Sequence, residues 1–342
     1  MVELTDDEVR LLRLRACLLS ARARRGVRDV VSRLVGVQAQ DRRSAALAVR
    51  ARSTVGSVSD VEAARVRDRS VVRGWFMRGT LHLVATPDLG WLLGLLGPGL
   101  VSSSRRRLAS LGVDESHASA VVSLLSKAGP STRAEIAAAM SLSGQAVYHA
   151  VRLAGLSGSA CYGPLRDGEE TWVLARDWLG PGPSRPDLSG DAALCELARR
   201  YLAGYGPASP LDLAAWSGLP APAARRAFAL VGSPLRPVSA DRAALGGVRR
   251  PAAGRTSVRL LPEFDPYLLG YRDRSLSVPR GYERRVHRGG GLFRPTITRD
   301  GLAVGVWTLE RGVVRLDPFE GSGAAWRAAA IREARAVERF LS

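Results

Sequence analysis

Three stretches of the chain repeat one pattern of hydrophobic and polar positions, and the clearest begins near residue 191. Apolar side chains recur there at the spacing of one helix face, and the pattern stops at residues 204–207. Ser209 then predicts the start of a second helix through Trp216, and a break at 218–220 precedes a third. This order predicts a helix-turn-helix unit. The inward positions are Leu194, Leu197, Ala198, Tyr201 and Leu202 in the first helix and Ala224, Phe228 and Val231 in the third, with Arg199, Arg200, Arg225 and Arg226 on the outer faces.

The stretch at 117–178 follows the same plan and adds a hairpin. A first helix ends at 129–130, Ser131 is expected to cap a second, and Ser143 to open a third. The segments CYGPL and ETWVL then flank an Asp-Gly turn at 167–168, which is typical of a β-hairpin. A helix-turn-helix followed by a hairpin is a winged helix, although any short three-helix bundle would share the helical part of the pattern. A polar stripe at i, i+4 and i+7 of the third helix is suited to base edges or phosphates: Gln145, His149 and Arg152.

The two ends of the chain complete this plan. Helical spacing over Val9–Leu19, Val30–Val35 and Ser44–Arg52 precedes a strand-like run at 71–86 that would supply a wing. At 294–316 three strands with turns at Asp300-Gly301 and Arg311-Gly312 predict a meander, and an apolar–basic helix closes the chain over Ala324–Leu341. We therefore expect an α+β protein of three helical modules and a β-rich C-terminal part with a closing helix. The expected boundaries are 1–110, 111–185, 186–258 and 259–342.

The charge of the chain adds a class of partner. Its 342 residues carry 50 basic and 32 acidic side chains, which gives a net charge of +18 and a pI near 11.2. Lys127 is the single lysine, so the cations are arginines, whose planar guanidinium suits phosphate. An anionic polymer is therefore the expected partner, and a coding bias that leaves arginines as solvated surface is the alternative.

Cysteines and histidines exclude several kinds of site. Cys17, Cys161 and Cys195 are far apart and odd in number, which fits a reducing cytoplasm and excludes a four-thiolate cluster. The four histidines include no H-x-x-x-H pair, so we expect no metal and no cofactor. The N-terminus lacks a signal pattern, and the most apolar stretch, 89–101, is short and broken by Pro98. We expect no membrane span and a cytoplasmic, nucleoid-associated protein.

The segment at 27–43 contains the sharpest candidate for chemistry. If the helix from Arg28 ends near Gly36, the residues that follow are extended, and residues two apart point the same way. Gln38 and Gln40 would then present two amides to one side, with Ala39 facing the core. Two amides can hold and orient one water molecule. Most Gln-x-Gln triplets merely face solvent, so the triplet by itself is weak evidence.

Four blocks of sequence place this triplet in context. LVGVQAQD at 34–41, VVRGWFMRGTLHLVATPDLGWLL at 71–93, LLPEFDPYLLGYRDRS at 260–275 and FRPTITRDGLAVGVW at 293–307 resemble, in order and spacing, the winged-helix superfamily that includes the AlkZ-like DNA glycosylases. The resemblance runs from about residue 10 to the C-terminus. It implies three tandem winged-helix modules that form a concave clamp on duplex DNA. It also implies hydrolysis of the N-glycosidic bond of N7-alkylated guanines by a glutamine–hydrophobic–glutamine motif, which Gln38-Ala39-Gln40 matches.

The same resemblance places the chain in one branch of the superfamily. A second branch has an aspartate at the position of Gln40. The all-glutamine branch is associated with crosslinks and bulky adducts, including the resistance of antibiotic producers to their own products. For a bulky adduct, extrusion into a snug pocket is costly, so we expect hydrolysis within a distorted duplex.

The chemistry of N7 alkylation suits these residues. The alkylated guanine is positively charged and leaves without protonation, so no strong general acid is needed. What remains is to place a water near C1′ and to stabilise the oxocarbenium-like sugar, which two neutral amides can do. Asp41 should point away from the glutamines and is interpreted as a cap or structural residue. A lyase step usually requires an amine, and Lys127 lies on a predicted helix, so we expect a monofunctional hydrolase.

The expected DNA contacts lie near the glutamines and in basic loops. If 71–84 is one strand, Arg73, Trp75, Arg78 and His82 share a face, where the arginines would contact phosphate and His82 would line the site. Core packing is the alternative for Trp75 and His82. The basic loops at 246–255 and 284–294 are expected to be mobile, and in YRDRS an Asp273–Arg ion pair is the alternative to a DNA contact. The other expected contacts are Gln145, His149, Arg152, Arg249, Arg250, Arg255, Arg272, Arg274 and Arg294.

Two functions of different classes follow. The favoured one is a monomeric DNA glycosylase that acts on double-stranded DNA carrying alkylated guanine and leaves an abasic site. The alternative is a non-catalytic winged-helix regulator. A regulator normally requires dimer symmetry or a sensor site, and the sequence contains no coiled coil or metal cluster to supply either.

Overall fold

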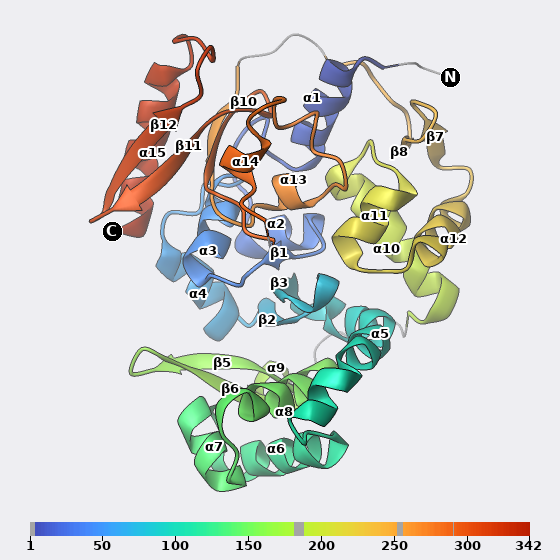
Figure 1. The fold of residues 1–342 in the computed structure, drawn as a ribbon, viewed down its shortest axis with the longest axis vertical. Coiled ribbons are helices and arrows are strands. Elements are labelled where there is room, and N and C mark those ends of the chain that lie inside the picture. The colour runs from blue at the N-terminus through green and yellow to red at the C-terminus, as the bar shows by residue number, and fades with distance from the viewer. Residues whose placement is uncertain (1–3, 181–187, 252–255, 290) are drawn as a thin grey trace. The chain divides into compact units, whose positions relative to one another are not determined.

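The computed structural model describes residues 4–180, 188–251, 256–289 and 291–342, so Arg255 lies outside the described residues. The chain forms two compact units, one made of Met1–Glu62 with Leu194–Ser342 and the other of Ala63–Ala193. Both units combine helices with small antiparallel sheets, which confirms the expected α+β class (Figure 1).

The helices of the first unit follow the local capping signals. A Ser209–Asp212 capping box opens the helix that ends at Ser217, and the next helix buries Ala224 and Phe228, as predicted. The helices are α1 (Asp6–Ala16), α2 (Val27–Arg33), α3 (Arg42–Arg50), α4 (Val58–Val66), α10 (Gly190–Tyr205), α11 (Pro210–Ser217), α12 (Ala221–Val231), α13 (Pro266–Leu269), α14 (Glu283–Val286) and α15 (Arg327–Leu341), of which α4 and α10 cross the unit boundary.

The sheet of the first unit confirms the predicted meander. Its strands are β9 (Val258–Leu261), β10 (Thr296–Arg299), β11 (Leu302–Glu310) and β12 (Val313–Pro318), in that spatial order, with α15 packed along them (Figure 1). At both predicted turns the first residue has positive φ, 51° at Asp300 and 50° at Arg311, and a glycine at 82° follows. This is the mirror-image turn that matches the twist of paired strands. The sequence pattern did not reveal β9. Short strands complete this unit: β1 (Val37–Gln38), β7 (Leu235–Pro237) and β8 (Ala243–Leu245).

The described residues of the loop predicted at 284–294 include regular structure. α14 occupies its start, and an antiparallel bridge joins His287 to Phe293. The two rings stack with centroids 4.6 Å apart, and the Arg294 amide donates to the carbonyl of Val286 at 2.8 Å. Aromatic stacking and backbone pairing therefore hold a segment whose composition suggested a solvated loop.

The second unit contains two small sheets surrounded by helices. The helix–helix–helix–hairpin order predicted at 117–178 is confirmed, with Asp167 and Gly168 at φ 53° and 84° in the hairpin turn. Thr132, rather than Ser131, caps the second helix, because the helix begins at Arg133 and the Thr132 hydroxyl accepts from the Glu135 amide at 3.3 Å. The elements are β2 (Val71–Trp75), η1 (Met77–Gly79), β3 (Leu81–Ala85), η2 (Thr86–Asp88), α5 (Leu89–Ser110), α6 (Glu115–Ala128), β4 (Ser131–Thr132), α7 (Arg133–Met140), α8 (Gly144–Leu156), β5 (Ala160–Arg166), β6 (Glu169–Leu174) and α9 (Ala175–Leu179).

Two predictions about the second unit are wrong. The run at 71–86 is a hairpin rather than one strand, because Arg78 and Gly79 adopt φ of 57° and 72° and reverse the chain. Pro98 does not break the apolar stretch: it lies inside the continuous helix α5, Leu89–Ser110. Among the described residues, no helix combines the length and apolar character that crossing a membrane requires.

Candidate active site

The segment that carries the two glutamines follows a well-defined helix end. α2 ends at Arg33, and φ is 58° at Val35 and 139° at Gly36, a value that favours glycine. The Gly36 amide donates to the carbonyl of Val31 at 3.0 Å, which closes the last turn. The predicted helix stop near Gly36 is therefore confirmed, and the chain continues in extended conformation at Val37–Gln38.

α10 holds this helix end in place. The Tyr205 hydroxyl donates to the carbonyl of Leu34 at 3.1 Å. The Arg200 guanidinium donates to the backbone carbonyl of Ser32 at 2.5 Å and contacts its hydroxyl at 3.1 Å. A Cβ on Gly204 would lie 2.6 Å from the carbonyl oxygen of the last residue of α2, so only glycine allows this approach. Arg200, predicted to be solvated, is 7% exposed because Ser32 supplies its acceptors, and that prediction is wrong.

Burial differs between the two glutamines. Ala39 is 1% exposed, so its predicted position facing the core is confirmed. Gln38 is 7% exposed, whereas Gln40 is exposed. One amide therefore lies in an enclosed, low-dielectric position and the other at the solvent boundary, where a water molecule has access.

Asp41 ends the segment as a helix cap. Its carboxylate accepts a hydrogen bond from the Ser44 amide at 2.6 Å at the start of α3, which confirms its interpretation as a cap. Burial and, secondly, the negative charge of Asp41 raise the pKa of Glu263, while Arg288 opposes the shift. Glu263 thus adds negative charge near the end of the triplet. Sequence reasoning missed it, although it lies in the block LLPEFDPYLLGYRDRS.

The hairpin of the second unit separates residues that were expected on one face. Arg73 pairs with Leu83 and Gly74 with His82 in the antiparallel register. Directly paired residues point to the same side, so His82 lies on the face opposite Arg73 and Trp75. Arg78 lies in the reversing turn, outside both strands. The predicted shared face of these four residues is wrong, because the chain turns back at residues 77–79.

Arg73 and Trp75 are held inside the second unit. The Arg73 guanidinium pairs with Glu170 and lies over the Tyr162 ring, 4.4 Å from its centroid. Trp75 is 1% exposed, and its indole nitrogen donates to the Tyr148 hydroxyl at 2.8 Å. Trp75 is therefore packed in the core, which was the alternative to a DNA contact. The charge of Arg73 is paired with a carboxylate within the same unit.

His82 is a buried, neutral imidazole. It is 2% exposed, and its Nδ1 lies 3.0 Å from the carbonyl oxygen of Thr80. Burial and the nearby positive charge of Arg78 lower the pKa of His82 to about 3. With Nδ1–H donating to the carbonyl, Nε2 is the remaining acceptor of the ring.

The three polar residues on one face of α8 become less exposed from the start of the helix toward its end. Gln145 is exposed and His149 is half-buried, whereas Arg152 is 8% exposed and donates to the Ser104 hydroxyl at 2.8 Å. Burial, Arg152 and Arg107 lower the pKa of His149. Of the three predicted DNA contacts in this stripe, Gln145 is the most open.

The other expected DNA contacts also differ in how far their side chains are exposed. Arg249 and Arg272 are exposed, and Arg250 is exposed with an ion pair to Glu8 at 3.1 Å. Arg294 is half-buried. Arg274 is also half-buried, donates to the Leu268 carbonyl at 2.8 Å and lies over Phe293.

The turn at YRDRS is organised by a serine. The Asp273 carboxylate accepts from the Ser275 amide and hydroxyl at 2.9 and 2.7 Å. These bonds occupy both carboxylate oxygens within the turn, while the Arg272 side chain stays exposed.

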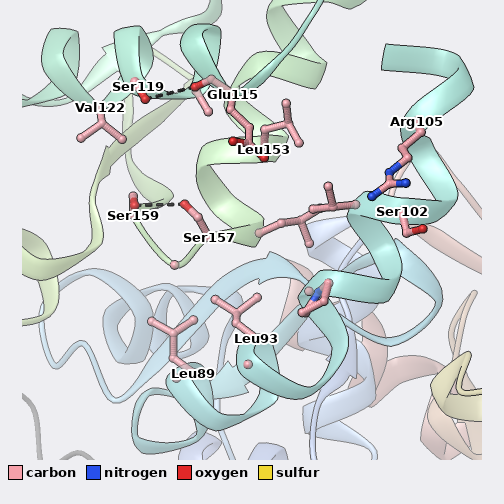
Figure 2. Close-up of a pocket in the computed structure, with 18 residues that line it drawn as sticks. Leu89, Leu93, Ser102, Arg105, Glu115, Ser119, Val122, Leu153, Ser157 and Ser159 are labelled. Atoms are coloured by element: carbon pink, nitrogen blue, oxygen red, sulfur yellow. Dashed lines mark hydrogen bonds between the residues drawn. The ribbon is translucent and has the colours of Figure 1, made fainter. Parts of the chain in front are cut away.

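A pocket of about 960 Å³ lies elsewhere in the second unit, between α5, α6 and the end of α8 (Figure 2). Leu89, Leu93, Val122 and Leu153 give it an apolar wall, and serine hydroxyls line its rim. The lining contains none of the residues predicted for catalysis or DNA contact.

Comparisons with known proteins identify the family. The family model described as DNA glycosylase AlkZ-like matches residues 31–340, a span that includes the glutamine triplet. The chain belongs to the AlkZ-like DNA glycosylase family. The AlkZ-like resemblance seen in the sequence is thereby confirmed.

Individual AlkZ-like relatives agree with this assignment. The chain is 28% identical over 331 residues to the interstrand DNA cross-link repair glycosylase of Streptomyces sahachiroi, covering 90% of this chain and 88% of the relative. It is also similar to the solved structure of Streptomyces sahachiroi DNA glycosylase AlkZ, with a TM-score of 0.79 and 26% identity over 99% of this chain and 97% of that one.

Proposed function

We propose that this chain is a monofunctional DNA glycosylase that hydrolyses the N-glycosidic bond of N7-alkylguanine in duplex DNA, with Gln38 and Gln40 as its catalytic pair. The observation that carries the proposal is the conformation of the triplet. A glycine-closed helix end precedes it, an aspartate-capped helix follows it, and Gln38 ends the extended strand Val37–Gln38 between them. Family membership supports the reaction class. The relative named for cross-link repair supports a bulky or crosslinked adduct, as in self-resistance to a DNA-alkylating natural product.

The two amides divide the work according to their burial. Gln38, at 7% exposure, is fixed in a low-dielectric position, where its carbonyl dipole stabilises the positive charge that develops on the sugar. Gln40 is exposed and positions the attacking water near C1′. Because the N7-alkylated base is already cationic, it departs without a proton. The carboxylates of Asp41 and Glu263 add negative potential that favours the cationic sugar.

The grip on DNA is proposed to come from helical units with attached hairpins. The order α6–β4–α7–α8–β5–β6, with β4 paired to β6, is typical of a winged helix, and α10–α11–α12–β7–β8 repeats its helical part. The exposed arginines, among them Arg249, Arg250 and Arg272, supply phosphate contacts that position the duplex without identifying the lesion. We propose that the protein acts on DNA as a monomer.

The test is a single-turnover assay on a duplex with one N7-alkylguanine, followed by mild base to cut abasic sites. Gln38→Ala and Gln40→Ala should each slow base release by about a hundredfold or more at saturating enzyme, the range for positioned acid–base and electrostatic groups. The third glutamine of the chain, Gln145, provides a matched control. Gln145→Ala should change DNA affinity at most and leave the saturated rate unchanged.

Two readouts distinguish the proposal from its alternatives. Without base treatment the strand should stay intact, and borohydride should trap no enzyme–DNA adduct, because the single lysine lies at the exposed end of α6. The variant that combines Gln38→Ala with Gln40→Ala provides the comparison. If the wild type releases the base no faster than this variant, and both bind DNA equally well, the protein is a non-catalytic DNA-binding protein instead.

A further inference from the structure

A group of arginines in the first unit carries more positive charge than its carboxylate balances. Arg22 and Arg50 both reach Oε2 of Glu333, at 2.5 and 3.4 Å. Arg259, on β9, lies within electrostatic range of Glu333 and Arg22. We call these four residues the arginine cluster. Its three guanidiniums and one carboxylate leave an excess of two positive charges.

Each arginine of the cluster has a buried N–H group that lacks an acceptor. The atoms are Nε of Arg22, Nη2 of Arg50 and Nε of Arg259. Other nitrogens of the same groups are satisfied, since Arg50 Nε donates to the Ala336 carbonyl at 3.1 Å and Arg259 Nη1 to the Val258 carbonyl at 2.8 Å. Buried polar groups in folded proteins are paired as a rule. Three unpaired donors in one charged group indicate a place for an acceptor.

The neighbouring charges do not cancel the excess. Arg52, which lies within range of Arg259, is itself paired with Asp265 at 2.7 and 2.9 Å. Burial and the positive charge of Arg22 lower the pKa of Arg50 to about 10, so Arg50 remains charged at neutral pH. The cluster therefore holds its two excess charges under physiological conditions.

We propose that Arg22, Arg50 and Arg259 form a binding site for a phosphate group. A phosphate group offsets part of the excess as a backbone phosphodiester with one negative charge and all of it as the free dianion, and its oxygens can accept from donors that approach in different directions. The Arg50 side chain is 5% exposed and the Arg22 side chain is 25% exposed, so Arg22 is the more accessible of the two. Glu333 joins Arg22 and Arg50 through a shared carboxylate oxygen.

The phosphate can come from free inorganic phosphate or from the DNA backbone, and the site itself does not rest on the proposed function. If the phosphate belongs to the DNA backbone, the position of the site fixes its distance from the glutamine triplet. Arg50 is the last residue of α3, and Asp41 caps the start of that helix. A backbone phosphate held here would be one helix length, about 13 Å, from the glutamine triplet.

The site is tested by thermal unfolding of the full chain, with sodium phosphate exchanged for sodium chloride at constant ionic strength. The wild type should show a saturable rise in Tm of several degrees, and calorimetric titration should give one phosphate per chain. Arg22→Gln should lose the rise, and Arg22→Lys, which keeps the charge but not the Nε donor, should retain part of it. Arg285→Gln removes an exposed ion pair with Asp317 and should behave as the wild type.

Circular dichroism in chloride first establishes that each variant is folded. A wild type without a saturable phosphate response would overturn the proposal, as would an equal response in Arg22→Gln. If Arg22→Gln fails to fold, the wild-type titration alone decides.

Binding to undamaged duplex at several salt concentrations then identifies the source. If the site holds backbone phosphate, Arg22→Gln should weaken binding and reduce the slope of log affinity against log salt by about 0.9. If it holds free phosphate, affinity and slope should not change. Neither result depends on base release, so the phosphate site and the glycosylase function are tested independently.

Discussion

Asp265→Asn should destabilise the first unit by about 3–5 kcal/mol, because it leaves the Arg52 guanidinium as an uncompensated buried charge. Both side chains are fully buried, and Arg52 donates to the two carboxylate oxygens of Asp265 at 2.7 and 2.9 Å. Arg52 also donates to the backbone carbonyls of Cys17 and Ala48 at 2.9 and 2.8 Å. The pair thus joins the ends of α1 and α3 to the segment before α13.

The size of the effect follows from what each replacement leaves behind. Asparagine keeps one acceptor, which can still cap Tyr267, whose amide now donates to Asp265 at 2.9 Å, but it turns amide donors toward the guanidinium. For a unit of this size, the loss corresponds to a fall in Tm of about 6–20 °C. Arg52→Met combined with Asp265→Asn removes both charges and should recover a large part of the loss.

Urea denaturation followed by tryptophan fluorescence and circular dichroism measures the change in unfolding free energy. Asp317→Asn is the matched control, because Asp317 forms an exposed ion pair with Arg285, and its loss should change stability by about 1 kcal/mol or less. A single variant that costs under about 1 kcal/mol, or a double variant less stable than the single, would refute the reasoning.

Three further outcomes are expected. Asp41→Ala, which removes the cap on the Ser44 amide, should cost about 0.5–2 kcal/mol in denaturant and slow base release, whereas Asp41→Ser should retain most of both. The folded pKa of His82, about 3, lies below its unfolded value, so its contribution to stability is present above about pH 6.5 and is lost as the pH falls toward 3; His82→Gln should flatten the pH dependence of Tm in that window. Gly204→Ala places a Cβ against the carbonyl of Arg33 and should cost about 1–3 kcal/mol with a parallel loss of base release, and unchanged activity would show that this contact does not position the triplet.

Local elements were predictable wherever their cause lies within a few residues. The hairpin turns at Asp167-Gly168 and Asp300-Gly301 and the Ser209 cap are fixed by positive φ or by a side chain that reaches its own backbone. The reversal at Arg78 escaped the pattern, because strand-forming residues flank it on both sides and the run resembled one strand. Only Gly79 signalled the turn.

The arginines show where such reasoning stops. Periodicity treats each of them as a solvated charge. The structure buries Arg52 against a carboxylate 213 residues away, Arg73 against Glu170 97 residues away and Arg200 against a carbonyl 168 residues away. No local pattern encodes such partners, because the sequence gives spacing along the chain and not proximity in space.

For the candidate site, the sequence by itself determined the local form of the glutamine segment. Gly36 ends one helix, Asp41 begins the next, and the short interval between them starts as an extended strand at Val37–Gln38. Tertiary structure decided that Gln38 is enclosed while Gln40 is open, and it decided which positive charges remain for a phosphate. The physical reason is that conformation over a few residues depends on backbone sterics and nearby hydrogen bonds, whereas burial and charge pairing depend on segments brought together from distant parts of the chain.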